Sequence, residues 1–126
     1  MSAYRRIVHV ENEHVLVRRA RWCDTFLAKL RGFTFRKSLP AGEGLVLVEK
    51  SDNRVNTAIH MLFVFMDLGV IWADGQGRVV DKVLARPWRL SYAPQSPARY
   101  VIETDPDVLS RVQIGDHVRF EEVQGG

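Results

Sequence analysis

The feature that most constrains the fold is a long apolar run from Ala58 to Ala73, which is interrupted only by His60, Asp67 and Gly69. A buried helix would fit its length, but its β-branched and aromatic side chains and its internal glycine favour strands. We therefore expect two buried strands separated by a kink, and place them at 59–65 and 68–73.

The turn sequence Asp-Gly-Gln-Gly at 74–77 predicts a hairpin after this run. Other runs of β-branched residues predict the remaining strands: 5–10, 14–19, 44–49, 78–84, 100–103 and 117–123. Two helices are expected, one at 25–31 behind an Asp24 N-cap and one begun by Asp105-Pro106. The sequence predicts an α+β fold: one domain over residues 1–126, a mainly antiparallel curved or barrel-like sheet, and two short helices.

Composition is that of an ordinary soluble protein, with 46% hydrophobic and 26% charged residues among 126. Cys23 is the only cysteine, which excludes an internal disulfide and a cysteine-rich zinc site. The first ten residues lack the apolar core of a signal peptide. The apolar run is shorter than the roughly 20 residues that span a bilayer. We expect a cytoplasmic protein without a membrane span.

Charge is unevenly placed along the chain, although the net charge is only +3. Residues 1–40 carry nine basic and three acidic side chains. Such a basic third is usually a solvated face, but it can attract nucleic acid or an acidic partner. The residues that would do so are Arg5, Arg6, Arg18, Arg19, Arg36 and Lys37.

No catalytic or metal-binding signature is present in the sequence. It contains no Ser-His-Asp order, no phosphate-binding loop and no His-Glu-x-x-His spacing. His9 and His14 flank a predicted turn, but a histidine pair without further ligands is a weak metal signal. We therefore predict no metal and no cofactor, and interpret Cys23 as a small buried apolar residue.

Several short motifs occur in a fixed order: Arg31-Gly32, Ile59-His60-Met61, Asp74 with its glycine turn, Pro87-Trp88-Arg89, Val101-Ile102-Glu103 and Ile114-Gly115-Asp116. Together they resemble the prokaryotic family known as domain of unknown function 192, over roughly residues 10–120. The resemblance implies a compact α+β, barrel-like domain and no established reaction. It also implies a Pro-x-Asp where this chain has Asp67-Leu68-Gly69, so the usual acid is replaced by Gly69 and a carboxylate stands two residues earlier.

The candidate ligand-binding residues are polar or aromatic side chains in or beside apolar segments. His60 is either a half-buried imidazole bonded to its surroundings or a binding and acid–base group. Trp88 and Arg89 offer a flat ring beside a guanidinium, unless they simply pack over the sheet. Glu103 is a candidate partner for one of the arginines. The full candidate set is His60, Asn56, Asp67, Trp88, Arg89, Glu103 and Arg36.

The leading functional hypothesis is a non-enzymatic binding module for a small polar or anionic ligand or a peptide. Its site would lie between the His60 strand and the 87–89 loop. One alternative is a hydrolase or transferase that uses His60 with Asp67 or Glu103. Others are a nucleic-acid-binding domain that uses the basic third, and an assembly protein that would expose an apolar patch.

Overall fold

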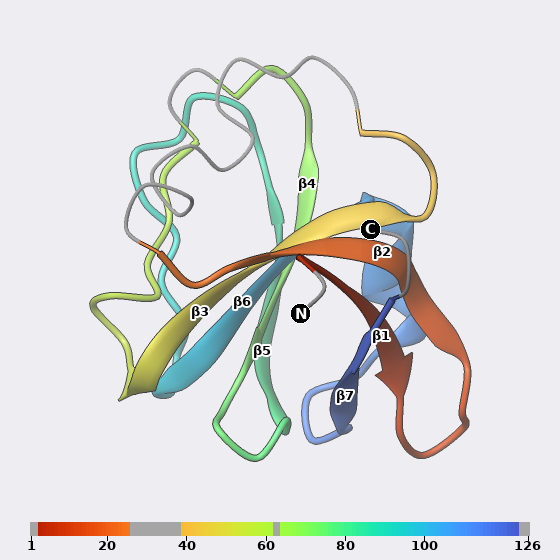
Figure 1. The fold of residues 1–126 in the computed structure, drawn as a ribbon. Helices are drawn as coiled ribbons and strands as arrows, with labels where there is room; N and C mark the ends of the chain where they lie inside the picture. The colour runs from red at the N-terminus through yellow and green to blue at the C-terminus, as the bar shows by residue number, and fades with distance from the viewer. Residues whose placement is uncertain (1–2, 26–38, 62–63, 124–126) are drawn as a thin grey trace.

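A computed structural model describes residues 3–25, 39–61 and 64–123. It contains seven strands and one short 3-10 helix, η1, which spans Pro106–Arg111 (Figure 1). The strands are β1 (Tyr4–His9), β2 (Val15–Cys23), β3 (Glu43–Asn53), β4 (Leu68–Ala73), β5 (Val79–Ala85), β6 (Ala98–Thr104) and β7 (Val118–Glu122).

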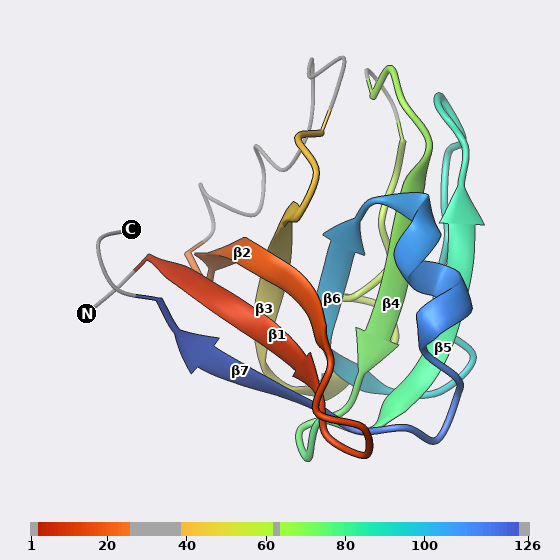
Figure 2. The same ribbon diagram turned by 90° about the vertical axis from the view of Figure 1, so that its right-hand side faces the viewer.

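All seven strands belong to one sheet in the order β5-β4-β6-β3-β2-β1-β7. Every neighbouring pair is antiparallel except β2 and β3, which run parallel. The sheet is strongly curled, and Figure 2 shows β1, β2 and β7 turned away from β4 and β5. The predicted curved, mainly antiparallel sheet is therefore confirmed.

The two edges of the sheet meet at one end. Arg78, just before β5, forms an isolated bridge with His117, just before β7. Beside it, Val79 N–H donates to Asp116 O at 2.8 Å, and Gly115 N–H donates to Val79 O at the same distance. These bonds satisfy backbone groups of the edge strands, which would otherwise be open to pairing with another chain.

Each face of the sheet buries its own apolar cluster, because successive side chains of a strand point to opposite faces. One cluster lies inside the curl and includes Val46, Ile71 and Ile102. The second lies on the other face and includes Leu45, Val70, Trp72 and Val101. Met61 and Val64, which lie between β3 and β4 in the chain, belong to the same cluster.

The expectation of an α+β fold with two short helices needs correction. Within the described residues the only helix is η1, so the fold is mostly β. Its start was predicted correctly, because Asp105 Oδ1 accepts from Asp107 N–H at 2.8 Å and Pro106 opens the helix. The helix expected at 25–31 falls almost entirely outside the described residues.

The strand expected at 59–65 is also wrong for its described part. Ile59 makes one isolated bridge, and residues 60, 61, 64 and 65 belong to no strand. The physical reason is that this segment pairs with a loop and not with the sheet. Met61 N–H donates to Arg89 O at 2.8 Å, and Trp88 N–H donates to Met61 O at 2.7 Å. The second half of the run does form β4, as predicted.

Candidate functional site

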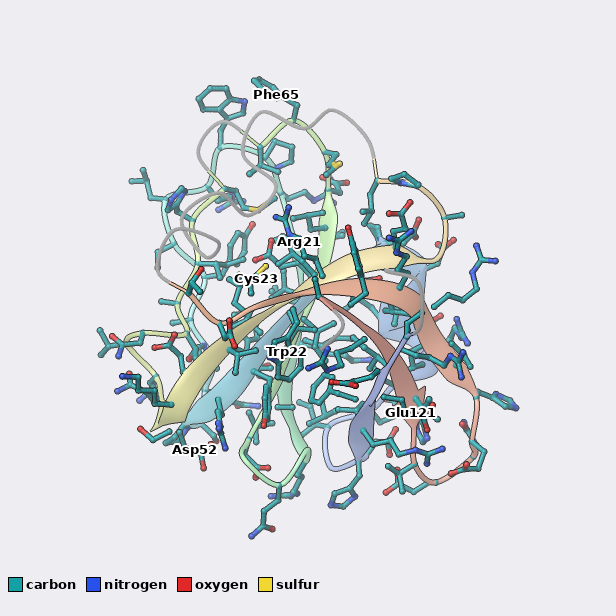
Figure 3. All side chains as sticks on the ribbon, in the orientation of Figure 1. Arg21, Trp22, Cys23, Asp52, Phe65 and Glu121 are labelled. Carbon is teal, nitrogen blue, oxygen red and sulfur yellow. The ribbon has the colours of Figure 1, made fainter. Side chains whose placement is uncertain are left out.

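Two loops, described over residues 54–61 with 64–67 and over residues 86–97, form a region that we call the loop end. Figure 3 shows Phe65 of the first loop far from Asp52 and Glu121. The loops are joined by the two backbone bonds at Met61 and by a reciprocal pair between Ile59 and Tyr92, both 2.8 Å long. The loop end is therefore a hydrogen-bonded unit, and no ligand can lie between the two backbones where they pair.

The first loop is anchored to the sheet through Trp72 of β4. The buried Trp72 donates from Nε1 to Thr57 O at 2.7 Å, and the buried Thr57 hydroxyl donates to Asn53 O. Asn53 Oδ1 accepts from the backbone N–H groups of Val55 and Asn56. The turn chemistry thus belongs to Asn53, whereas the candidate Asn56 is exposed.

Trp88 stands in an unusual backbone conformation. Its φ of 67° lies in the left-handed region, which a bulky residue rarely adopts. Holding it there costs about 1–3 kcal/mol, which the bonds at Met61 help to offset. The indole is nevertheless 48% exposed and meets Phe65 edge to face, with ring centroids 5.7 Å apart. The backbone at Trp88 is therefore in a destabilising conformation although its aromatic side chain is largely at the surface.

Two further exposed side chains, one basic and one apolar, follow Trp88 directly in the chain. Phe65 is 42% exposed and Leu90 is 77% exposed, and Arg89 stands between Trp88 and Leu90. We call Phe65, Trp88, Arg89 and Leu90 the aromatic rim. His60 is exposed in the loop that pairs with the rim, which disagrees with the first of its two interpretations, a half-buried imidazole.

Asp67 lies beside the second loop and not in the sheet. One of its carboxylate oxygens is 3.8 Å from Arg86 Nη1, a partly exposed pair of small energetic value. Gly69, which stands where the family resemblance implies an acid, has no space for a side chain. A Cβ there would lie 2.9 Å from Asp105 O and 3.2 Å from Pro106 Cα.

Glu103 is the carboxylic acid whose pKa is clearly raised among the described residues. It pairs with Leu45 and Val70 in the sheet, and strand alternation places its side chain on the face of the second cluster. Burial raises the pKa of Glu103 to about 7. Burial also raises the pKa of the Cys23 thiol, and the negative charge of an ionised Glu103 raises that pKa further. A buried thiol with a raised pKa fits a core residue better than a nucleophile.

The candidates from sequence therefore separate into two places. Trp88, Arg89 and His60 share the loop end, while Glu103 is buried on the sheet. No ion pair or hydrogen bond of the Glu103 carboxyl occurs within the described residues, so the pairing expected with Arg89 is not seen. Arg36 lies outside those residues. The sequence analysis missed Phe65, whose place in an apolar run gave no sign that it is exposed.

The fold and the loop end define a class, a small domain with a single curled mixed sheet and a surface built by two paired loops. The chain belongs to the DUF192 family, described as an uncharacterized ACR, whose pattern matches residues 7–120. The predicted family membership is thus confirmed. Within the described residues no helix has the length and apolar character needed to cross a membrane.

Curated relatives agree with this membership. A UPF0127 protein of Thermococcus gammatolerans is 44% identical over 100 residues, which cover 78% of this chain and 63% of the relative. One from Pyrococcus furiosus is 30% identical over 102 residues, covering 79% of this chain and 84% of the relative. The chain spans less than two thirds of the length of the Thermococcus gammatolerans relative.

Two crystal structures share the fold. A protein of unknown function from Novosphingobium aromaticivorans has a TM-score of 0.78 at 20% identity, covering 92% of this chain and 83% of that one. A protein from Sinorhizobium meliloti, for which a role as a transcription regulator has been suggested, has a TM-score of 0.81 at 17% identity. That match covers 94% of this chain and 95% of the other. At these sequence identities the structural similarity shows only that the fold is shared.

Proposed function

We propose that the protein is a non-enzymatic binding module whose aromatic rim takes a peptide segment with an acidic side chain beside an apolar one. The observation that carries this proposal is Trp88, a bulky residue held in a left-handed backbone conformation with its indole exposed. Strained residues persist where their surroundings enforce them, and they concentrate at binding and catalytic sites.

The chemistry of the rim supports an acidic and apolar partner. Phe65, Trp88 and Leu90 are exposed apolar side chains, and aromatic residues and arginine are the side chains that interface centres favour. Arg89 supplies a guanidinium fork for a carboxylate. Because these apolar side chains are 42–77% exposed, they would enclose a small ligand poorly, and an extended segment fits them better.

The enzymatic alternative has weaker support. His60 is exposed, whereas Glu103 is only 6% exposed on the sheet, and Asp67 is engaged by Arg86. General acid–base chemistry requires the acid within hydrogen-bond reach of its partner. A raised pKa, such as that of Glu103, also occurs in buried groups without any catalytic role.

The nucleic-acid alternative depends on free basic side chains in the N-terminal third. Arg5 lies 3.5 Å from Glu122 and Arg6 lies 3.5 Å from Glu121, so acids of β7 offset part of this charge. Arg5 also stacks over Trp22. Retention on heparin that falls steeply with salt would favour this alternative over the rim.

The proposal is tested by measuring binding of synthetic peptides that place glutamate beside leucine or phenylalanine, with fluorescence anisotropy as the readout. Trp88→Gly removes the indole and suits the left-handed backbone, so we expect weaker binding by about 10-fold or more. The same substitution should leave the free energy of unfolding unchanged or raise it by up to about 1 kcal/mol.

Two further variants make the test specific. Arg89→Gln should also weaken binding, because it removes the charge that faces the peptide carboxylate. Ile114→Ala is the matched control, since Ile114 is an apolar side chain, 50% exposed, in the turn before β7. Equal affinity of Trp88→Gly and the unmodified protein for every peptide that binds would refute the proposal.

A further inference from the structure

A second cluster of polar side chains lies away from the loop end, where the turn after β1 meets the turn before β7. His9, at the end of β1, is only 5% exposed. Its Nε2 lies 2.8 Å from Asp116 Oδ2, and its Nδ1 lies 3.6 Å from Glu11 Oε1. His9 and Asp116 are 107 residues apart, so only the closure of the sheet brings them together.

Within the described residues, the side chains that pair with the two carboxylates of this cluster are histidines. Glu11 accepts from His117, through the backbone N–H at 2.8 Å and through Nδ1 at 2.7 Å. Asp116 accepts from His9 and from Gln113 N–H. No lysine or arginine pairs with either acid within the described residues, although the chain has 18 such side chains.

The neighbouring acid shows the contrast. Glu13, two residues after Glu11, receives a forked pair of bonds from Arg119, both 2.8 Å long. Glu11 and Asp116 are instead close enough for the charge of Glu11 to raise the pKa of Asp116, although its hydrogen bonds lower that pKa on balance. Glu11 and Asp116 thus lie beside the His9 imidazole with no lysine or arginine against them in the described part of the chain.

We infer that His9, Glu11 and Asp116 form a binding site for one divalent transition-metal ion of the zinc class. One ligand atom from each of the three residues lies within 4.8 Å of the other two. Ligands about 2.0–2.2 Å from a tetrahedral zinc ion lie roughly 3.3 Å apart, so small side-chain movements suffice. The two carboxylates balance the charge of the ion, and the fourth position remains for water or an exchanged ligand.

The donor set selects the class of ion. One imidazole nitrogen with two carboxylate oxygens suits zinc and its neighbours, whereas magnesium and calcium prefer oxygen ligands alone. Because His9 Nδ1 accepts from Asn12 N–H at 3.3 Å, the ring carries its proton on Nε2 and donates it to Asp116 Oδ2. The ion takes the place of that proton, which passes through solvent to Nδ1 and leaves the imidazole neutral. The Asn12 N–H group, which has then lost its acceptor, donates a hydrogen bond to solvent.

This site differs from the histidine pair considered in the sequence analysis. His14 is exposed and takes no part in the cluster. The other two ligands of the ion come from Glu11 in the adjacent turn and from Asp116 near the far end of the chain. A bound ion would join the two turns and so reinforce the contact between the edges of the sheet.

The test is a calorimetric titration of the full chain with zinc chloride, with magnesium chloride as the comparison ion. We expect one zinc ion per chain and no magnesium binding. Glu11→Gln and Asp116→Asn should each weaken zinc binding by about 10-fold or more, since each removes a charged ligand. Glu13→Gln and His14→Gln are matched controls in the same turn and should bind as the unmodified protein does.

A second readout follows the ligand atom directly. In a long-range nitrogen–proton spectrum, zinc should shift the His9 Nε2 resonance and leave that of His14 unchanged. Glu11 is 45% exposed at its side chain, so Glu11→Gln keeps the test decisive even when Asp116→Asn disturbs folding. Absence of saturable zinc binding up to about 1 mM, or full binding by Glu11→Gln with His9 unshifted, would overturn the inference.

Discussion

Glu103 should make the protein less stable as the pH rises from 4.5 to about 7. The carboxyl is buried on β6, and its pKa is raised from an ordinary 4.5 to about 7 by burial. Between these two values the folded state keeps a proton that the unfolded state releases. The unfolded state therefore binds fewer protons, and the free energy of unfolding falls as pH increases.

The size of the effect follows from the two pKa values. Their difference is 7 − 4.5 = 2.5 pH units, and each unit corresponds to about 1.4 kcal/mol, which gives about 3 kcal/mol in total. This stability is fully present below pH 4.5 and is lost progressively up to about pH 7, above which the effect is constant. Glu103→Gln keeps the shape of the side chain and removes the titration.

The assay is urea denaturation of the unmodified protein and of Glu103→Gln at several pH values between 5 and 8. We expect the variant to gain stability relative to the unmodified protein as the pH rises, by about 2–3 kcal/mol over this range. The absolute cost of burying an amide is the same at every pH, so it cancels from this trend. Glu122→Gln, at an exposed site of β7, controls for the substitution itself. A stability difference that does not change with pH would refute the reasoning.

Three further substitutions test the packing that positions the loop end and η1. Trp72→Phe removes the donor to Thr57 O and should lower the free energy of unfolding by about 1–3 kcal/mol, measured by urea denaturation. Gly69→Ala forces a Cβ toward the Asp105 carbonyl and should cost about 1–3 kcal/mol, visible as a lower Tm. Lys82→Met removes two bonds from Nζ to the carbonyls of Leu109 and Val112, so the amides of η1 should exchange faster with deuterium. A Tm equal to that of the unmodified protein would contradict the account of Gly69, and unchanged exchange would contradict that of Lys82.

Local features were predictable from the sequence where one short segment determines them. The hairpin after β4 follows from its turn residues, because Asp74 Oδ1 accepts from two turn amides and Gly77 adopts a φ of 81°. The start of η1 follows equally from Asp105 and Pro106. In both places the residues that form the turn are adjacent in the chain, so composition and spacing carry the information.

Features that depend on distant pairing were not predictable in this way. Ile59 and Met61 have the composition of a strand, yet their backbones bond to the 88–92 segment and not to the sheet. The spacing of apolar residues indicates that a segment is buried, but it does not identify the segment with which its backbone pairs. For the same reason the parallel pairing of β2 with β3 and the contact of His9 with Asp116 have no local signature.

The candidate site was predicted in part. Trp88 and Arg89 were named because a ring beside a guanidinium suits recognition by stacking and forked hydrogen bonds, and both lie in the loop end. Their edge-to-face neighbour Phe65 was not named, since its exposure depends on how the two loops pair. Glu103 was expected to pair with Arg89 or Arg36. Among the described residues it has no such partner, and its burial depends on the strands that pack around it.

The measurement that tests the central claim most directly is a nitrogen–proton correlation spectrum with the indole resonances of Trp22, Trp72 and Trp88 assigned. It would be recorded during titration with pooled metabolites and with the acidic, apolar peptides. The account predicts saturable shifts at the Trp88 indole and at the amides of Arg89 and Leu90, while the Trp22 and Trp72 indoles stay unchanged. Saturable shifts elsewhere on the sheet, with Trp88 unmoved, would contradict it.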